Sequence, residues 1–380
     1  MKLILDSRPK AVAGARACAR EFGFDKSIGW KLFQIGCATD FITALSAMPG
    51  ARGWEIAFAK FEAAGVPAPK VAEAQWALSV FEKQLADRRI DRSMLSGMAA
   101  AVVDTDESRR QMLRLRKQAS DAMAVIHGVH CAARVGGFLV MPSKTSGMAD
   151  LAALTIVEGL ERRRPGPPWP LYDPIHSYDA KGAGLAHATS GIGRGAREPI
   201  VDDLSSPKVL ETEIGSREDR AGAFDFVGRS ATRTEALTVS FAEHATAVGP
   251  LTKRGNETQC ELSMPVTVPT SVAIFDLLIH RSIKRTGPVN AEMFASGVVS
   301  RQSRPARDSL RLGLEALVRT PTSLHIPEVS AGTSAAYAEL CRRSADRFGF
   351  DRADFEVQRI VVPHPPVPCT LQMWWELAGS

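Results

Sequence analysis

The sequence predicts an α+β protein in which an all-helical N-terminal domain precedes a mostly antiparallel α+β C-terminal domain. Up to about residue 164, apolar residues recur every three or four positions, which is typical of helices. A segment rich in Pro and Gly follows, and short runs of β-branched residues then alternate with polar ones. These observations place a helical domain at 1–163, a linker or large loop at 164–205, and an α+β domain that binds a ligand or partner at 206–380.

The helices of the first domain follow from this periodicity and from the residues that interrupt it. Gly23, the Pro49–Gly50 pair, and Gly65 with Pro67 are typical of helix ends and turns. The predicted helices are 7–22, 25–36, 40–47, 53–64, 69–89, 92–103, 107–138 and 150–163.

The C-terminal half is predicted to be mainly strands. Four prolines at 165, 167, 168 and 170 exclude a helix or a central strand at the start of the linker. The predicted strands are 209–214, 223–227, 236–245, 259–268, 272–279, 294–299, 355–362 and 370–377, with helices at 307–318 and 331–348.

The positive charge is confined to the first third of the chain. Residues 1–130 contain 19 Lys and Arg against 14 Asp and Glu, whereas the remaining 250 residues contain 28 of each. This asymmetry favours an anionic partner for the first part and a different partner for the rest.

The six cysteines are widely spaced and include no C-x-x-C pair, so we expect free thiols rather than disulfides or a zinc ribbon. Free thiols favour a reducing compartment, and we expect a bacterial-type cytoplasm. The first residues lack the apolar run of a signal peptide, and the longest apolar stretches, near 135–141 and 271–279, are too short to span a bilayer. We therefore expect no membrane association.

The segment 11–36 has the pattern of two short helices joined by a tight turn. Gly23 can adopt the left-handed conformation of such a turn, and Asp25 can cap the second helix. Ile28, Leu32 and Ile35 then form an inward stripe. Polar and basic side chains lie on the opposite side of the second helix: Lys26, Ser27, Trp30, Lys31 and Gln34.

This segment resembles the helix-turn-helix of bacterial transcription regulators, over about 25 of 380 residues. Ala19, Gly23, Phe24 and the triplet at 25–27 carry the resemblance. It implies that the polar side chains just named read base edges and hold phosphates. One position departs from the pattern, because Gly29 stands where the family has a buried aliphatic residue. The alternative interpretation is an ordinary helical hairpin inside a bundle.

A second basic cluster lies at 109–117, where five positive charges occur within nine residues. On a helix, Arg109, Arg110, Arg114 and Lys117 fall mostly on one face, which suits contacts to DNA phosphates. The alternative is a solvated helix face that is partly neutralised by the acidic residues just upstream.

The segment 69–89 carries a coiled-coil-like seam. Val71, Ala74, Leu78, Phe81 and Leu85 follow one another at spacings of three and four. The seam predicts either a homodimer, which would match a two-fold-symmetric operator, or the core of a helical bundle.

Other residues with catalytic or ligand-binding chemistry form no recognised motif. His127, His130 and Cys131 suggest a metal site, but their small apolar surroundings and the lack of a second ligand cluster favour packed or capping histidines. We therefore predict no metal and no cofactor. An enzyme would have to use some of His176, His280, Asp276 and His364 in the C-terminal half.

The sequence leaves three functions open. The first is a DNA-binding transcription regulator whose C-terminal domain senses an unknown small molecule or protein. The others are a protein-interaction or scaffold protein without enzymatic activity, and an enzyme with its site in the α+β half.

Overall fold

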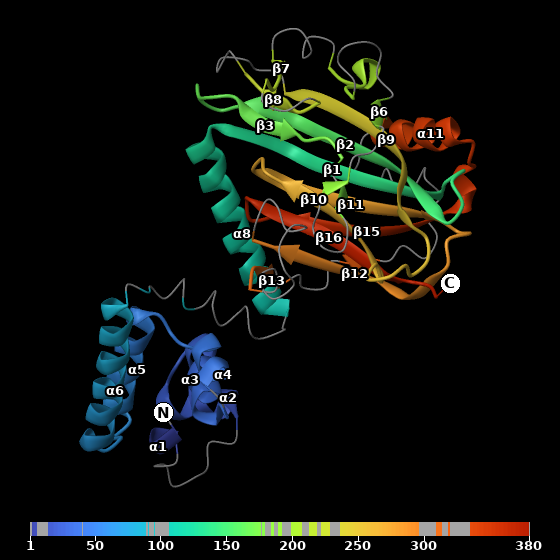
Figure 1. The fold of residues 1–380 in the computed structure, drawn as a ribbon. Coiled ribbons are helices and arrows are strands. Elements are labelled where there is room, and N and C mark those ends of the chain that lie inside the picture. Colours follow the sequence, from blue (N-terminus) through green and yellow to red (C-terminus); the bar gives the residue numbers. More distant parts are fainter. Residues whose placement is uncertain are drawn as a thin grey trace. The chain divides into compact units, whose positions relative to one another are not determined.

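The computed structural model describes residues 2–5, 14–39, 41–88, 90, 95, 106–175, 177–178, 184–185, 189–191, 199–206, 213–218, 222–228, 236–295, 309–313, 318–319 and 335–379. Within these residues the protein is α+β, as predicted (Figure 1). Contacts divide the chain into two units, Met1–Leu115 and Arg116–Ser380. All strands among the described residues belong to the second unit.

Helices make up the first unit. They are α1 (Lys2–Leu5), α2 (Ala15–Phe22), α3 (Lys26–Cys37), α4 (Phe41–Ser46), α5 (Ala51–Ala63) and α6 (Ala68–Asp87). These bounds match the helices predicted at 25–36, 40–47, 53–64 and 69–89, and α2 matches the second half of 7–22. The helix predicted at 92–103 lies outside the described residues apart from Leu95.

Three phenylalanines hold α2, α3 and α5 together. The Phe61 ring of α5 lies edge-on to Phe22, with ring centroids 5.0 Å apart, and to Phe24, at 5.4 Å. Leu32 of α3 and Val71 of α6 are buried in the same core. Ile4 and Leu5 of α1 belong to it as well, and because five helices share this core, the orientation of α3 is fixed within the unit.

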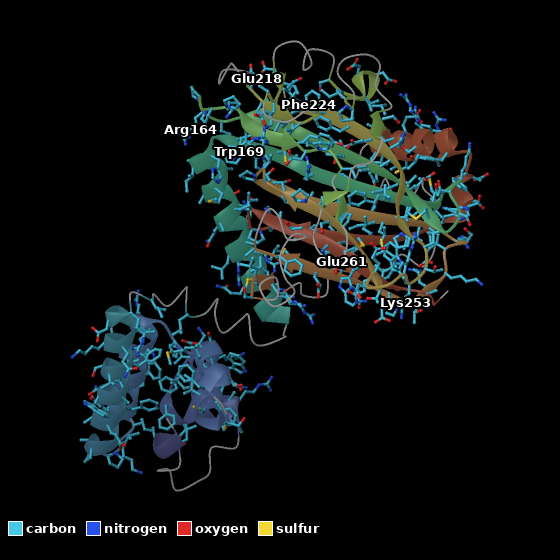
Figure 2. The ribbon with its side chains drawn as sticks, in the orientation of Figure 1. Arg164, Trp169, Glu218, Phe224, Lys253 and Glu261 are labelled. Atoms are coloured by element: carbon cyan, nitrogen blue, oxygen red, sulfur yellow. The ribbon has the colours of Figure 1, made fainter. Side chains whose placement is uncertain are left out.

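The long helix α8 (Asp106–His127) spans the division between the units and ends earlier than predicted. Gly128 has φ +68°, and its N–H donates to the Ala124 carbonyl. Arg164, labelled in Figure 2, donates to the last carbonyls of the helix, at Val125 and Ile126. A cation at this position complements the negative end of the helix. The predicted helix 107–138 was therefore wrong beyond His127.

A seven-stranded sheet forms the centre of the second unit. Its order is β14 (Val318–Arg319), β15 (Phe355–Pro363), β11 (Thr270–His280), β1 (Val129–Pro142), β2 (Met148–Arg162), β9 (Leu237–Pro250) and β6 (Thr189–Gly191). Neighbouring strands are antiparallel except β1 and β11, which are parallel. The antiparallel expectation was therefore correct for most of this sheet.

The predicted helix 150–163 was wrong, because this segment is β2. Leu151, Leu154, Val157 and Leu160 are spaced by three, which imitates a helix. All four are buried, three of the six residues between them are buried too, and the other three are partly buried, because both faces of the sheet are covered. A strand buried on both faces loses its alternation and cannot be distinguished from a buried helix by periodicity.

Two layers cover the central sheet, one on each face. Tyr337 and Leu340 of α11 (Ala335–Phe348) pack against Val135 and Leu139 of β1 on one face. On the other face lies a four-stranded sheet of order β10 (Gln259–Val266), β16 (Cys369–Leu377), β12 (Arg285–Phe294) and β13 (Arg311–Leu312).

Two consecutive glycines of β1, Gly136 and Gly137, leave room for side chains of these two layers. A Cβ on Gly136 would lie 2.2 Å from the Met264 sulfur of β10, and one on Gly137 would lie 2.2 Å from the Tyr337 hydroxyl. Glycine is therefore required where both layers approach β1 most closely.

The predicted linker 164–205 belongs to the second unit. Its β3 (Trp169–Tyr172) pairs with β8 (Phe224–Phe226), which pairs in turn with β7 (Ile214–Ser216). It also contains β4 (Ser177–Tyr178), β5 (Gly184–Leu185), β6 and the short helix η2 (Asp202–Leu204). The domain boundary predicted at 163 was therefore wrong. The proline-rich segment after it belongs to a connection between strands of the central sheet, and it does not separate two domains.

The helix predicted at 307–318 was also wrong in its described part. Arg311 and Leu312 form β13, which pairs with Met293 and Phe294 at the end of β12. Edge pairing of this kind depends on a partner strand far away in the sequence, and local periodicity does not report it.

An ion pair is buried where β11 meets β15. Arg359 donates from Nε and a terminal nitrogen to the two carboxylate oxygens of Asp276, at 2.7 and 2.8 Å. The two residues are direct partners in the strand register, and the Asp276 side chain is fully buried. Burial raises the pKa of Asp276, and the hydrogen bonds from Arg359 oppose this shift.

Candidate nucleic-acid interface

The turn between α2 and α3 has the local geometry that the sequence predicts. Gly23 ends α2 with φ +68°, and the Phe24 N–H donates to the Ala19 carbonyl at 2.8 Å. The Asp25 carboxylate accepts hydrogen bonds from the backbone N–H groups of Ser27, at 2.7 Å, and Ile28, at 2.9 Å. These bonds satisfy donors that a helix N-terminus otherwise leaves unpaired.

The departure at Gly29 has a structural reason. A Cβ at this position would lie 2.5 Å from the Ala19 Cβ, so α2 and α3 cross where neither residue has a larger side chain. A buried aliphatic residue would not fit there. Leu32, one turn later, is completely buried and anchors α3 instead.

The predicted contact residues of α3 divide into two groups. Lys26, Ser27 and Trp30 are exposed, and half of the Trp30 surface is accessible. Lys31 and Gln34 are partly covered. The first turn and a half of α3 therefore presents a cation, a hydroxyl and an indole, while the later positions have less access.

Sequence reasoning missed Lys60 of α5. Its Nζ lies 3.7 Å from the position a Cβ on Gly23 would occupy, and the residue is exposed. The ammonium group therefore stands beside the turn that leads into α3. No local signal identifies it, because Lys60 reaches this place only through the packing of α5 against α2.

The basic stripe of α8 is exposed at Arg109, Arg110, Arg114 and Lys117. Lys117 forms an ion pair with Asp121 at 2.7 Å, and this contact lowers the pKa of Asp121. The sequence suggested that the stripe is partly neutralised by acids upstream of it, and the structure adds an acid downstream, because Asp121 lies at i+4 from Lys117. Lys117 falls in the second unit, whereas the three arginines fall in the first.

The seam predicted on 69–89 is used inside the first unit. Val71 is buried, and Ala74 and Leu78 pack against the same core. The Phe81 ring contacts Phe41, with centroids 6.4 Å apart. Apart from Val71, the residues of the seam are only partly buried, so the bundle covers part of it and the dimer through 69–89 stays a prediction.

The three enzyme candidates that the structure describes do not come together. Asp276 is paired with Arg359, and His280 contacts Ser282 through Nδ1 at 2.7 Å. The backbone N–H of His364 donates to the Ser271 carbonyl at 2.9 Å. Ser271 lies at the opposite end of β11 from His280, roughly 30 Å away at ~3.3 Å per residue. His176 lies outside the described residues.

A different set of residues forms a hydrogen-bonding chain across three strands. His130 Nε2 lies 3.3 Å from the Ser271 Oγ, and His130 Nδ1 lies 3.4 Å from Glu161. Burial, followed by the charge of Arg163, lowers the pKa of His130, which favours the neutral ring. Arg163 also binds the same Glu161 oxygen at 2.7 Å.

The other two residues of the predicted metal motif have separate environments. The His127 ring packs on Trp169 with centroids 4.5 Å apart, and Cys131 is buried in the sheet. Within the described ranges, the structure contains no group of three His, Cys, Asp or Glu side chains placed to hold a metal ion. No helix in this part of the chain combines the length and apolar character needed to cross a membrane.

Comparisons with known proteins assign no family. No family model matches the chain, and no curated protein matches it. Among solved structures, one described as "a putative protease from Parabacteroides distasonis" is similar, with a TM-score of 0.23 and 6% identity. The match covers 65% of this chain and 40% of that protein, and at this TM-score it supports no argument.

Proposed function

We propose that the protein binds double-stranded DNA through the α2–α3 helix-turn-helix and acts as a transcription regulator. The observation that carries this proposal is the exposed start of α3, where Lys26, Ser27 and Trp30 lie beyond a capped glycine turn. In helix-turn-helix proteins, this end of the second helix contacts base edges in the major groove.

Each exposed group has a role that follows from its chemistry. Ser27 can donate to or accept from a base edge, and the Trp30 indole offers an apolar surface and one N–H donor. Lys26 and Lys60 suit phosphate oxygens on either side of the groove, because ammonium groups bind phosphates as point charges. The arginines of α8 supply further phosphate contacts.

In this proposal the helical unit binds DNA and the α+β unit senses a small molecule or a protein partner. A cytoplasmic location fits the six free thiols among the described residues. The sensing unit would alter DNA affinity by favouring one arrangement of the DNA-binding surfaces.

The test measures binding of the full chain to a fluorescently labelled, mixed-sequence DNA duplex. Fluorescence anisotropy of the duplex gives the affinity at several salt concentrations. We expect binding at low salt that weakens as salt rises. In Lys26→Ala/Lys60→Ala, the logarithmic salt slope should fall by up to about 1.8, since each lost phosphate contact removes about 0.9.

The matched control is Lys144→Ala/Lys253→Ala, which removes two exposed lysines from the second unit. This control should keep the salt slope. Absence of binding at low salt, or equal slopes in both double variants, would contradict the proposal. Purification with a protein instead of nucleic acid would favour the scaffold interpretation.

A second candidate function, acyl-group hydrolysis, is favoured by the Ser271–His130–Glu161 chain. A neutral His130 could take the Ser271 proton as Oγ attacks an ester carbonyl, and then give that proton to the departing alcohol. Water that gives a proton to the same ring would then attack the acyl group, which leaves as the acid while Ser271 regains its proton. Glu161 is placed to orient the ring, although Arg163 neutralises part of its charge.

A fluorophosphonate probe distinguishes this candidate, because it labels only activated serines. The hydrolase interpretation requires labelling of the wild-type chain that is lost in Ser271→Ala and in His130→Ala. An unlabelled wild-type protein would eliminate it without affecting the DNA-binding proposal.

A further inference from the structure

One face of α6 is not used by the helical bundle. Trp76 is 67% exposed, and Val80, one turn later, is 36% exposed. Ala72, one turn earlier on the same side, is exposed too. A tryptophan side chain buries about 150–250 Å² when it packs, so this indole is the largest unused apolar surface on the helix.

Charged residues flank this apolar pair symmetrically. Glu73 lies three residues before Trp76, and Lys83 lies three residues after Val80; both are exposed. Both spacings are centred on position 78. A two-fold axis at that level would place Trp76 against Val80 of a second copy and Glu73 against its Lys83.

We propose that the outer face of α6, formed by Ala72, Glu73, Trp76, Val80 and Lys83, joins two copies of this chain as an antiparallel helix pair. In a two-fold interface the same patch serves both subunits, so every contact occurs twice. Here Trp76 and Val80 would form two apolar pairs, Glu73 and Lys83 two opposite-charge pairs, and Ala72 would lie against the exposed Gln84.

The charge pattern selects this occupant and this direction. A parallel pair would place Glu73 against Glu73 and Lys83 against Lys83, which is repulsive. Glu73 and Lys83 lie at equal distances from position 78. A two-fold dimer requires this symmetry for the charges to pair, whereas an unrelated partner does not. At 1.5 Å per residue, Glu73 and Lys83 are about 15 Å apart along the axis, so the contact extends over half of α6.

The dimer uses the opposite side of α6 from the predicted seam, since Val71, Ala74 and Leu78 face the core. It deepens the proposed function, because a two-fold dimer would match a two-fold-symmetric operator. Dimerisation is measured without DNA. A monomer that binds DNA would contradict only the dimer, and a dimer that does not bind DNA would contradict only the proposed function.

The experiment is sedimentation equilibrium of the full chain from about 1 μM to about 100 μM, a range that detects dissociation constants near micromolar. We expect a monomer–dimer equilibrium. Trp76→Ala should raise the dissociation constant at least tenfold. Because Trp76 is largely exposed, circular dichroism should show an unchanged fold.

Charge exchange tests the antiparallel direction. Glu73→Lys and Lys83→Glu should each weaken the dimer, whereas the double variant Glu73→Lys/Lys83→Glu should restore it, since both pairs are then re-formed in reverse. Glu55→Lys on the exposed surface of α5 is the matched control and should leave association unchanged.

Three results would overturn the proposal. These are a monomer at every concentration, a dimer that Trp76→Ala does not weaken, and a double charge variant that is no better than the single ones. A monomer whose Trp76 fluorescence resists quenching by acrylamide would show that the chain covers this face itself.

Discussion

The two units differ in where their charged and aromatic side chains lie: several are exposed in the helical unit, and several are buried in the α+β unit. In the helical unit, cations and aromatic side chains face outward, at Lys26, Trp30 and Trp76, around a core of phenylalanines. In the α+β unit, the charged pair Asp276–Arg359 and the imidazole of His244 are buried between layers. Outward groups are available to a large partner, whereas buried groups mainly fix the packing of the layers that enclose them.

Breaking the buried ion pair should produce the largest effect. Arg359→Met leaves the Asp276 carboxylate buried without its partner, and we expect a loss of about 3–5 kcal/mol in unfolding free energy. Asp276→Leu/Arg359→Met should recover most of the loss, because no charge then stays buried. Urea denaturation monitored by Trp375, which is buried in this unit, measures both. A loss below about 1 kcal/mol in the single variant would show that water reaches the pair.

Acid should weaken the same unit through His244. Burial lowers the pKa of His244 to about 4, whereas an unfolded histidine titrates near 6.5. As the pH falls from about 6.5 to about 4, His244 binds a proton in the unfolded chain but not in the folded protein. The unfolding free energy therefore falls with pH, by roughly 3 kcal/mol in total.

The variant His244→Gln isolates this contribution, because it keeps a polar side chain near the Ser344 hydroxyl, which lies 3.2 Å from His244 Nε2. Its stability should depend less on pH between about 6.5 and 4 than that of the wild type. Identical pH profiles would mean that His244 titrates normally in the folded protein.

In the helical unit, the sharpest test of packing is Gly29→Ala. The added methyl group meets Ala19 at 2.5 Å and should cost about 1–3 kcal/mol, with a matching loss of DNA affinity if α3 moves. Ala19→Gly combined with Gly29→Ala should recover part of both. Gly50→Ala meets no atom within 4 Å, so it should lose only what alanine costs in place of glycine at the N-cap of α5, about 0.5–1 kcal/mol. Equal effects at 29 and 50 would contradict the close helix crossing.

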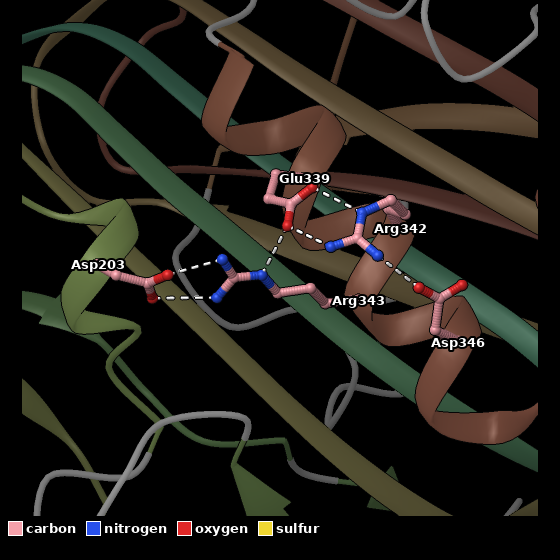
Figure 3. A network of polar contacts seen from close by, with 5 residues as sticks. All are labelled: Asp203, Glu339, Arg342, Arg343 and Asp346. Carbon is pink, nitrogen blue, oxygen red and sulfur yellow. Dashed lines mark hydrogen bonds and ion pairs between the residues drawn. The ribbon is translucent and has the colours of Figure 1, made fainter.

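The smallest effect is expected at the surface of the second unit. Figure 3 shows Arg343 of α11 bridging Asp203 of η2 and Glu339 of its own helix. Hydrogen bonds from Arg342, and then from Arg343, lower the pKa of Glu339 to about 2. The contacts of Arg343 are solvent-accessible, so Arg343→Ala should cost no more than about 1 kcal/mol. Thermal denaturation should show this difference shrinking as salt rises. A loss above about 1 kcal/mol would mean that the contact between α11 and η2 is less open to solvent than a surface ion pair.

The sequence predicted the local features of the candidate DNA-binding site. Gly23 and Asp25 act through their own backbone and near neighbours, so the turn and the cap could be inferred from residue type alone. The exposed positions of Lys26 and Trp30 follow from the inward stripe through Leu32. Lys60 could not be found this way, because it belongs to another helix.

Where sequence reasoning failed, contacts between distant segments decide the outcome. The segment around Leu154 became a strand because sheets and helices cover both of its sides, and the seam through Leu78 became core because other helices pack against it.

By itself, the sequence determined α2 to α6 of the first unit, most strands after residue 236, the capped turn before α3 and the concentration of positive charge in the first third. Only the tertiary structure decided where the sheet begins, which face of α6 is exposed and which polar groups are buried. The physical reason is range: caps, turns and alternation act between residues a few positions apart, whereas burial depends on segments that meet only after the chain has folded.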